Sequence, residues 1–568
     1  MAIFQEVGTG DRYAGGADGC QVRALIRTAA LRGWSLAGSD IRVAFLNAPK
    51  RDTTKITAME VPTIFKHLGL ADAEDVWIIE KALYGLVSSP RDWGIHRDEV
   101  LPTLRWHRKI GDVVLEGRLV HSKDENLWRL VEVNKETGTE NWAGLMSAYV
   151  DDILVSGEPQ TVKLAMEAIQ NTWALSEVEW ASDKPLRYCG FEISMGAAGD
   201  GFYVSQGMYE QELMTRWDIK ESLQYPAFKV TEDDEHFVGE IDPNDVRTAQ
   251  MMTGALLWLS TRTRPDLVFG VSAMSRLTTK NPKKAVEIGY VLLKYLYGNP
   301  GGMHYPQTIP GGDWGRRGQL KARRHQKMLE VFSDISYAAG ADHRSIQGLV
   351  VYYAGVPIAW QCGVQPIVAH STAEAELIAY CESLVVGRAT EALLAAIWQQ
   401  WNFEKVIYGD NAGAINLAHG VTTASWRTCH LRIRASVLKE ALDESNRRIG
   451  GGWRLLHLKG TELVADGCTK PLQGQAFTQF VDDLGLRRTR REHRSVPEDR
   501  PTAGGEHHGA AMRAMMVGGM LLSAAEAYEE EPEADGDFTW VWVTGAVLMA
   551  MGAIYAGQLL HSASIAVV

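Results

Sequence analysis

Seven acidic side chains fall into two groups whose surroundings predict metal chemistry. In the first half of the chain, the adjacent pair Asp151 and Asp152 follows Tyr149 at the tip of an expected hairpin with apolar flanks. Buried like charges cannot both stay ionised without a cation, so this pair predicts a bound divalent ion. Mg²⁺ is the expected ion, because it takes carboxylate and phosphate oxygens. An ordinary Asp-Asp turn is the alternative.

A third carboxylate upstream favours the metal interpretation. Asp40 stands near the start of an expected strand over residues 39–47. Phosphoryl-transfer sites need carboxylates from separate strands to hold two cations, which makes Asp40 a candidate ligand beside the Asp-Asp hairpin. The alternative for Asp40 is a plain turn residue.

Four acids in the second half of the chain stand on separate expected elements. Asp334 and Asp410 each end a strand, Glu376 lies in a long helix, and Asp466 lies in a helix after the last strand. This arrangement suits a two-metal hydrolase, in which one Mg²⁺ activates water and the other stabilises the leaving oxygen.

Capping is a competing role for two acids in this region. Ser371 and Glu374 match a capping box, so Glu374 has a structural role while Glu376 can turn toward a site. Asp410 directly precedes a helix expected over 412–418, and capping that helix is its alternative role.

Composition limits the classes of protein that fit. The 568 residues are enough for three or four domains of roughly 150 residues each. Acidic residues outnumber basic ones 70 to 58, giving a net charge of -12, so nucleic acid would need a local basic groove or bound metal ions. The 6 cysteines show no CxxC spacing, which indicates neither a zinc site nor a disulfide framework.

The first half resembles the reverse transcriptase of Ty1/copia-type LTR retrotransposons. Three motifs of that family occur here in the family's order. The motif that ends in "AFLN" stands at 44–47, the motif "LYGL…PR.W" at 83–93 and the motif "YVDD" at 149–152. Downstream, residues 188–193 and 253–297 resemble its "LG.EI" segment and its connection region.

This resemblance implies roles for individual residues. The resemblance implies that Asp40, Asp151 and Asp152 are the metal-binding triad of the polymerase palm. Its implied substrate-binding residues are Phe45, which would crowd a ribose 2′-OH, Arg91 and Tyr149.

Two features depart from the family pattern. Val87 and Ser88 stand where the family has Lys-Gln, so one contact to the incoming nucleotide is expected to be absent. The chain also begins close to Asp40, so we expect the fingers to be truncated.

The second half resembles the ribonuclease H domain that ends copia-type polyproteins. The matching landmarks are residues 333–334, 342–345, 371–376, 409–411, 427–430 and 465–472. The resemblance implies that Asp334, Glu376, Asp410 and Asp466 are metal ligands. His430 falls on the landmark histidine of the family, and an ordinary surface or core histidine is the alternative.

Together these observations predict α/β and α+β architecture. The expected parts are a palm with truncated fingers over 1–225, a helical thumb- or connection-like region over 226–310, a basic linker over 311–328, an RNase H-like mixed-sheet domain over 329–486, a disordered tail over 487–537 and an apolar segment over 538–568.

The apolar segment is a candidate transmembrane helix. Residues 538–568 contain no charged side chain, and 539–560 is long enough to span a bilayer, with Trp540 and Trp542 near one end. Read-through sequence without a function is the alternative. Residues 1–6 show no signal-peptide pattern. The expected location is therefore intracellular, in the cytoplasm or nucleus, with membrane anchoring through 539–560 as a further expectation.

The resemblance implies an RNA-directed DNA polymerase with RNase H activity. Its expected cofactor is Mg²⁺, with Mn²⁺ as a substitute, and its expected partners are an RNA template, a DNA primer, an RNA–DNA hybrid and dNTPs. Two alternatives stay open at this point. In the first alternative, only the RNase H is active. In the second, the chain is a non-catalytic retroelement remnant that binds nucleic acid.

Overall fold

The structure is a computed structural model. It describes residues 3–4, 18–51, 56–72, 74–122, 124, 126–196, 199–309, 325–340, 342–399, 403–420, 431–443 and 452–488. His430, the expected tail beyond residue 488 and the candidate membrane segment 539–560 lie outside these ranges. Among the helices in the described ranges, none combines the length and apolar character needed to cross a bilayer.

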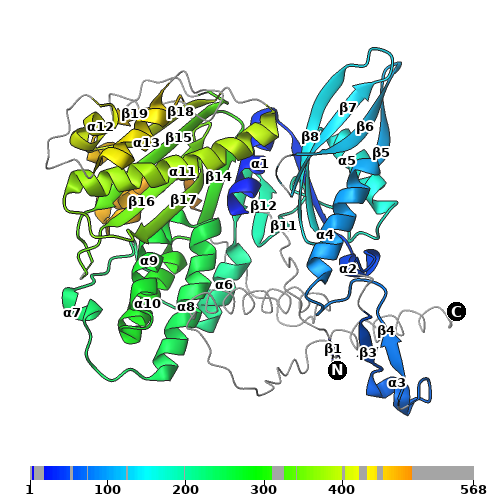
Figure 1. Ribbon diagram of the computed structural model, residues 1–568, viewed down its shortest axis with the longest axis horizontal. Helices are drawn as coiled ribbons and strands as arrows, with labels where there is room; N and C mark the ends of the chain where they lie inside the picture. The colour runs from blue at the N-terminus through cyan, green and yellow to red at the C-terminus, as the bar shows by residue number, and fades with distance from the viewer. Residues whose placement is uncertain are drawn as a thin grey trace. The chain divides into compact units, whose positions relative to one another are not determined.

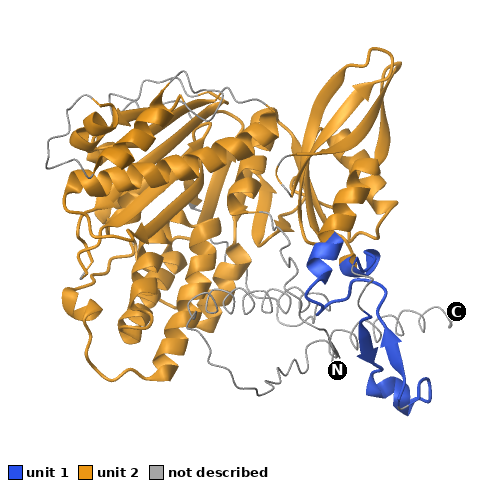
Figure 2. Ribbon diagram, viewed as in Figure 1, with its two compact units in different colours: residues 1–13, 45–93, 491–568 blue, residues 14–44, 94–490 orange. Residues whose placement is uncertain are grey.

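The chain divides into two compact units, which are coloured separately in Figure 2. The smaller unit comprises residues 1–13, 45–93 and 491–568, and the larger one comprises 14–44 and 94–490. The smaller unit contains an antiparallel sheet of order β1-β3-β4. Its strands are β1 Ile3–Phe4, β3 Ala58–Glu60 and β4 Val76–Ile78, and its helix is α3 Thr63–His67. Helices α2 Ala44–Asn47 and α4 Ser89–Val100 cross the boundaries of the two units.

The larger unit begins with a seven-stranded sheet of order β10-β2-β9-β8-β7-β6-β5. Its strands are β2 Ser35–Asp40, β5 Arg105–Ile110, β6 Val113–His121, β7 Leu127–Asn134, β8 Glu140–Tyr149, β9 Asp152–Gly157 and β10 Glu179–Trp180. The associated helices are α1 Gly19–Arg32, η1 Leu101–Thr103 and α5 Pro159–Gln170. The apolar run of β8 and β9 is buried in the centre of the sheet, which places their connecting turn at its edge.

The expected strand over residues 39–47 is wrong in its extent. Strand β2 ends at Asp40, and the Ile41 N–H then donates to the Asp151 carbonyl at 2.9 Å. Val43 adopts a φ of +50°, a left-handed conformation that ends the extended backbone, and residues 44–47 form α2. Asp40 therefore lies at the end of a strand and not at its start.

A second sheet and a group of helices follow. The sheet has the order β11-β12-β13-β14-β20, with β11 Leu186–Tyr188, β12 Phe191–Met195, β13 Gly201–Ser205, β14 Gly301–Pro306 and β20 Leu486–Arg488. The helices are α6 Gly207–Arg216, α7 Glu232–Glu235, α8 Pro243–Arg262, η2 Pro265–Leu267, α9 Val268–Leu277 and α10 Pro282–Gly298.

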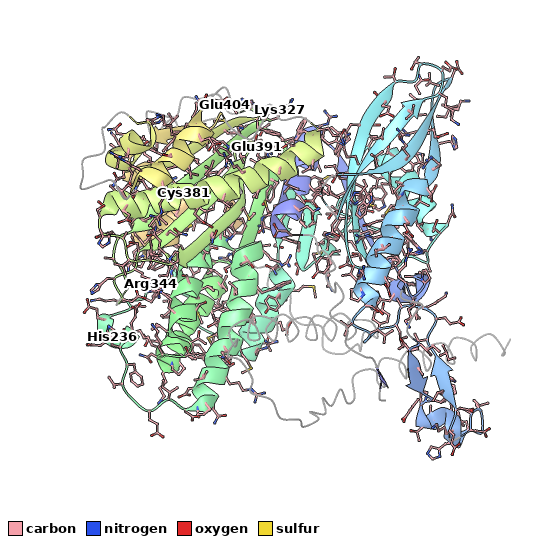
Figure 3. All side chains as sticks on the ribbon, viewed as in Figure 1. His236, Lys327, Arg344, Cys381, Glu391 and Glu404 are labelled. Atoms are coloured by element: carbon pink, nitrogen blue, oxygen red, sulfur yellow. The ribbon has the colours of Figure 1, made fainter. Side chains whose placement is uncertain are left out.

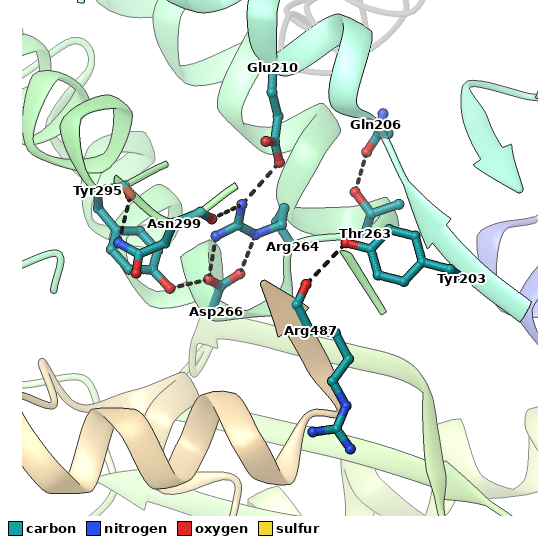
Figure 4. Close-up of polar contacts among 9 residues, drawn as sticks. All are labelled: Tyr203, Gln206, Glu210, Thr263, Arg264, Asp266, Tyr295, Asn299 and Arg487. Carbon is teal, nitrogen blue, oxygen red and sulfur yellow. Dashed lines mark hydrogen bonds and ion pairs between the residues drawn. The ribbon is translucent and has the colours of Figure 1, made fainter. Parts of the chain in front are cut away.

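A buried polar network joins these helices (Figure 4). The Arg264 guanidinium donates to both carboxylate oxygens of Asp266, at 3.0 and 2.8 Å, and to Glu210 at 3.0 Å. The Tyr295 hydroxyl donates to Asp266 at 2.6 Å, and the Asn299 carbonyl accepts from Arg264 at 3.1 Å. A buried arginine with two carboxylate partners has its charge compensated, so the network fixes α6 and α10 around η2.

The last part of the larger unit is a mixed sheet of order β17-β16-β15-β18-β19. Its strands are β15 Met328–Ser336, β16 Ile346–Tyr353, β17 Val356–Val364, β18 Glu404–Gly409 and β19 Arg454–His457. The first three pair antiparallel, whereas β18 lies parallel to both β15 and β19. The helices are α11 Thr372–Trp398, α12 Ala412–Ala418, α13 Arg432–Leu442, η6 Gly460–Glu462, α14 Asp466–Thr469 and α15 Gly474–Asp483.

Helix α11 lies across this mixed sheet and packs mainly against β15 (Figure 1). Cys381 and Glu391 mark its course in Figure 3. The Glu391 carboxylate accepts from the Lys405 ammonium of β18 at 2.8 Å, and both side chains are buried. This ion pair fixes the helix over the sheet and thereby the position of residues near its N-terminus.

Buried arginines of α1 connect the mixed sheet to the rest of the larger unit. The Arg23 guanidinium donates to the Ile358 carbonyl at 2.6 Å and to the Thr261 carbonyl at 3.0 Å. Arg27 donates to the Ala354 carbonyl at 2.6 Å. Since Ile358 belongs to β17 and Thr261 to α8, one helix joins three parts of the fold.

Candidate functional site

The first acidic cluster, Asp40, Asp151 and Asp152, forms at the turn between β8 and β9. In the antiparallel pairing of β2 with β9, Asp40 lies directly opposite Asp152. Tyr149 is the partner of Asp152 across the β8–β9 hairpin. Three carboxylates from two strands and one turn therefore meet at one edge of the sheet, and all three are partly buried.

The turn itself has an unusual backbone. Val150 adopts a φ of +54°, a left-handed conformation that is uncommon for a β-branched residue. Such conformations cost free energy and are concentrated at functional sites. The turn presents Asp151 and Asp152 next to Asp40 at this cost.

The electrostatics of the first cluster agree with a site that needs a cation. Burial, together with the charges of Asp151 and Asp40, raises the pKa of Asp152 to about 7. The Cys189 amide donates a hydrogen bond to Asp152 and acts in the opposite direction. Cys189 lies in the turn between β11 and β12, with a φ of +48°. Its role was not predicted, although a two-residue turn before Phe191 is a recognisable hairpin signal.

The expected substrate-binding residues fall in both units. Tyr149 lies beside the first cluster and is partly buried, which raises the pKa of its hydroxyl. Phe45 and Arg91 belong to the smaller unit, where the Phe45 ring packs against the Tyr84 ring with their centroids 4.6 Å apart. Arg91 is exposed on α4. The substrate-binding roles of these three residues stay predictions.

The second acidic cluster consists of Asp334, Glu376, Asp410 and Asp466. Strands β15 and β18 are parallel, with Phe332 opposite Tyr408, so two residues further along Asp334 and Asp410 come side by side. Helix α11 brings Glu376 over the same point. One carboxylate oxygen from each of Asp334, Glu376 and Asp410 lies within 4.8 Å of the other two. Among the described residues, no equally close group joins Asp40, Asp151 and Asp152.

The capping alternatives are now decided. The side chain of Asn411, and not that of Asp410, caps α12 by accepting from the Ala414 amide at 2.9 Å. The Ser371 hydroxyl accepts from the Glu374 amide at 3.2 Å, as expected. The Glu374 carboxylate accepts from the His370 amide at 2.8 Å, one residue before the position that a capping box requires. Asp410 and Glu376 are therefore not the residues that cap these two helices.

Burial and repulsion dominate the electrostatics of this cluster. Asp334 and Glu376 are exposed by 1% and 3%. Burial and then the charge of Asp466 raise the pKa of Asp334 to about 7. Burial and the charges of Asp334 and Asp410 raise the pKa of Glu376 to about 9. A divalent cation among these oxygens would favour the ionised forms, so the donor set fits a hard metal ion.

Asp466 reaches the cluster from α14. It is not in the 4.8 Å group, but the Lys470 ammonium contacts Asp466 at 2.8 Å and Asp334 at 3.3 Å. The Thr469 hydroxyl donates to the same oxygen of Asp334. Thr469 and Lys470 were not predicted as site residues, although the spacing of Asp466 and Lys470, four positions apart, is that of a helical ion pair.

Two glycines allow this close approach. Gly348 lies opposite Asp334 in the β15–β16 pairing, and a Cβ there would come within 2.6 Å of the Cys468 Cβ. A Cβ on Gly409 would come within 2.2 Å of the Tyr380 hydroxyl. The small residues therefore let α14 and α11 approach the strands that carry Asp334 and Asp410.

The sequence comparisons show the class of protein to which the chain is related. It is 24% identical over 486 residues to the retrovirus-related Pol polyprotein from transposon RE1 of Arabidopsis thaliana, covering 82% of this chain and 28% of the relative. It is 23% identical over 483 residues to the corresponding polyprotein from transposon TNT 1-94 of Nicotiana tabacum, covering 82% of this chain and 32% of the relative. No family model matches the chain.

These relatives confirm the expected resemblance. The homologues of the chain are Pol polyproteins from Ty1/copia-type retrotransposons. The chain spans only 28% of the length of the RE1 and RE2 polyproteins. The putative transposon Ty5-1 protein of Saccharomyces cerevisiae, in contrast, is matched over 99% of its length, at 23% identity and 61% of this chain.

Solved structures of two kinds align with the chain. RNase H1 from the archaeon Halobacterium salinarum NRC-1 aligns over 28% of this chain and 98% of its own, with 18% identity and a TM-score of 0.18. The Prototype Foamy Virus protease-reverse transcriptase aligns over 78% of this chain and 45% of its own, with 12% identity and a TM-score of 0.20.

Proposed function

We propose that this chain is a retroelement-derived enzyme that cleaves RNA in RNA–DNA hybrids and extends a DNA primer on an RNA template. The observation that carries the nuclease part is the convergence of Asp334, Glu376 and Asp410, whose oxygens lie within 4.8 Å of one another in a largely buried position. The homologous Pol polyproteins support the same class of function.

Asp334, Glu376 and Asp410 would hold divalent cations, with Asp466 completing the set. Mg²⁺ is the proposed ion and Mn²⁺ a substitute, because both take carboxylate oxygens. When bound, such ions activate water and stabilise the leaving oxygen of a phosphodiester. The protein contributes the geometry: parallel strands align Asp334 with Asp410, and α11 supplies Glu376 from above the sheet.

The proposed substrate is held mainly through its sugar-phosphate backbone. The chain is acidic overall, with a net charge of -12, so its surface as a whole does not attract nucleic acid. Metal ions in the second cluster would provide positive charge where the scissile phosphate lies. An RNA–DNA hybrid would then be recognised by shape and by its 2′-hydroxyl groups.

A hybrid-cleavage assay in Mg²⁺ tests the nuclease. We expect the parent chain to cleave the RNA strand, and Asp410→Asn to lower the rate by about 10²- to 10³-fold, the size of effect expected for one electrostatic stabiliser. Asp482→Asn is the matched control, because Asp482 is exposed on α15 in the same part of the chain. Equal cleavage rates in the parent and in Asp410→Asn would show that the second cluster does not take part in the reaction.

The polymerase part rests on the pairing of Asp40 with Asp152 next to Asp151. In this proposal the three carboxylates hold divalent cations that bind the phosphates of a dNTP, and Tyr149 contacts the nucleotide. Phe45 and Arg91 belong to the smaller unit, and their substrate-binding roles stay predictions of the family resemblance. Primer extension should be lost in Asp152→Asn and retained in the exposed control Asp183→Asn.

The two assays together separate the alternatives. Cleavage without extension in the parent would leave an RNase H as the remaining activity. Hybrid binding with neither activity, unchanged in Asp334→Asn, would indicate a non-catalytic remnant that binds nucleic acid.

A further inference from the structure

Lys470 is placed between two carboxylates of the second acidic cluster. Its ammonium lies 2.8 Å from an oxygen of Asp466 and 3.3 Å from an oxygen of Asp334. The side chain is 39% exposed, so it contacts solvent as well as the two acids.

The local fold fixes this lysine from several directions. The Lys470 amide donates to the Asp466 carbonyl at 3.0 Å, at the end of the short helix α14. The preceding residue, Thr469, donates its hydroxyl to Asp334. The buried Cys468 packs directly on Gly348, which is the strand partner of Asp334. Lys470 is thus carried to Asp334 by packing as well as by charge.

An ammonium in this position competes with a divalent ion. A divalent cation held by Asp334 and Asp466 would take the same carboxylate oxygens that contact the ammonium. Two cations cannot share that space, because their repulsion is large at such separations. Without either cation, the buried carboxylate of Asp334 and the partly buried carboxylate of Asp466 would repel each other.

We propose that Lys470 is a built-in counter-cation, which holds Asp334 and Asp466 together in the metal-free protein and moves away when a divalent ion binds between them. This inference rests on the proposed metal-dependent function. Lys470 is then a positioning residue, which keeps the site assembled and lowers its affinity for one of the metal ions.

Lysine footprinting on the unaltered protein tests the movement. The full chain is acetylated with an amine-reactive reagent in EDTA and in Mg²⁺, and modification of each lysine is followed by peptide mass spectrometry. We expect Lys470 to react several-fold faster in Mg²⁺, since its ammonium is then released from the two acids. The exposed Lys439 of α13 should react equally in both conditions.

Metal affinity provides the second test. Titration calorimetry with Mn²⁺ should show about tenfold tighter binding in Lys470→Met, because a competing positive charge is gone. Lys439→Met should bind as the parent does, and Lys470→Arg should keep the lower affinity of the parent.

The outcomes distinguish this inference from the proposed function. Mn²⁺ binding that is weakened by Asp410→Asn, with neither a change in Lys470 reactivity nor tighter binding in Lys470→Met, would overturn the counter-cation role alone. No Mn²⁺ binding to the parent would overturn both. Since footprinting uses the parent protein, the test does not depend on the stability of Lys470→Met.

Discussion

The two acidic clusters gather carboxylates by different means. The first uses neighbouring strands and a two-residue turn, so Asp151 and Asp152 are brought together by local structure and only Asp40 comes from a distance. The second takes Asp334 from strand β15, Glu376 from helix α11 and Asp410 from the position just after strand β18, and their oxygens come within 4.8 Å of one another. Convergence from separate elements therefore gives the tighter arrangement.

Two acids of the second cluster are also more deeply buried than the acids of the first cluster. The acids of the first cluster are all partly buried, whereas Asp334 and Glu376 are 1% and 3% exposed. Charges interact more strongly away from water, so the second cluster has the greater need for a cation. Burial is nevertheless the largest cause of a raised pKa in both clusters, to about 7 for Asp152 and Asp334 and to about 9 for Glu376.

The largest expected effect is that a substitution in either cluster removes one activity and leaves the other unchanged. Glu376→Gln should lower hybrid cleavage by about 10²- to 10³-fold and leave primer extension unchanged, while Asp152→Asn should do the reverse. The matched control is Glu374→Gln, two positions away on α11, because Glu374 serves the His370 amide. Loss of both activities in either variant would show that the clusters do not act independently.

Packing around the second cluster should matter next. Gly348→Ala places a Cβ 2.6 Å from that of Cys468 and should push α14 away, at a cost of about 1–3 kcal/mol in the free energy of unfolding. Gly363→Ala on the neighbouring strand β17 meets nothing within 4 Å and should be close to neutral. Chemical denaturation measures both. Equal stability of the two variants would contradict the packing around Asp334.

The dependence of stability on pH should reveal the buried repulsion. The pKa of Glu376 is raised to about 9 in the folded chain, so the folded state binds more protons than the unfolded state above the ordinary glutamate pKa of about 4.3. Metal-free stability should therefore fall as the pH rises from about 4 to about 9. Thermal unfolding in EDTA measures this slope. Glu376→Gln should flatten it, and an unchanged slope would contradict the assignment.

The smallest expected effect concerns the cap of α12. Asn411→Ala should cost about 1 kcal/mol of stability, since the Asn411 side chain accepts from the Ala414 amide. Asp410→Asn should not be destabilised in metal-free buffer, because it removes a negative charge from the cluster. If Asp410→Asn lowered stability by the same amount as Asn411→Ala, Asp410 would be a residue that caps α12.

Local patterns predicted the parts of the site that depend on neighbouring residues. The apolar flanks of Tyr149 to Asp152 predicted the hairpin, and the serine and glutamate at the start of α11 predicted a structural role for Glu374. The strand over residues 39–47 was wrong because the apolar residues after Asp40 are typical of a strand, while the bonds that end it come from Asp151 and Ala174.

Contacts between distant residues could not be predicted in this way. Thr469 reaches Asp334 across 135 positions of sequence, through packing that depends on Gly348 and Cys468. The choice between Asp410 and Asn411 as the cap depends on side-chain geometry that adjacent residue types do not determine. The sequence pattern and the family resemblance predicted the four acids of the second cluster, whereas the contacts that Thr469 and Lys470 make with them depend on tertiary structure.

Calorimetric titration of the metal-free chain with Mg²⁺ or Mn²⁺ tests the central claim most directly. If Asp334, Glu376 and Asp410 hold a divalent ion, the parent and Glu374→Gln should bind with equal affinity, and Glu376→Gln should bind at least about tenfold more weakly. Equal affinity in all three proteins, or no binding to the parent, would contradict the account.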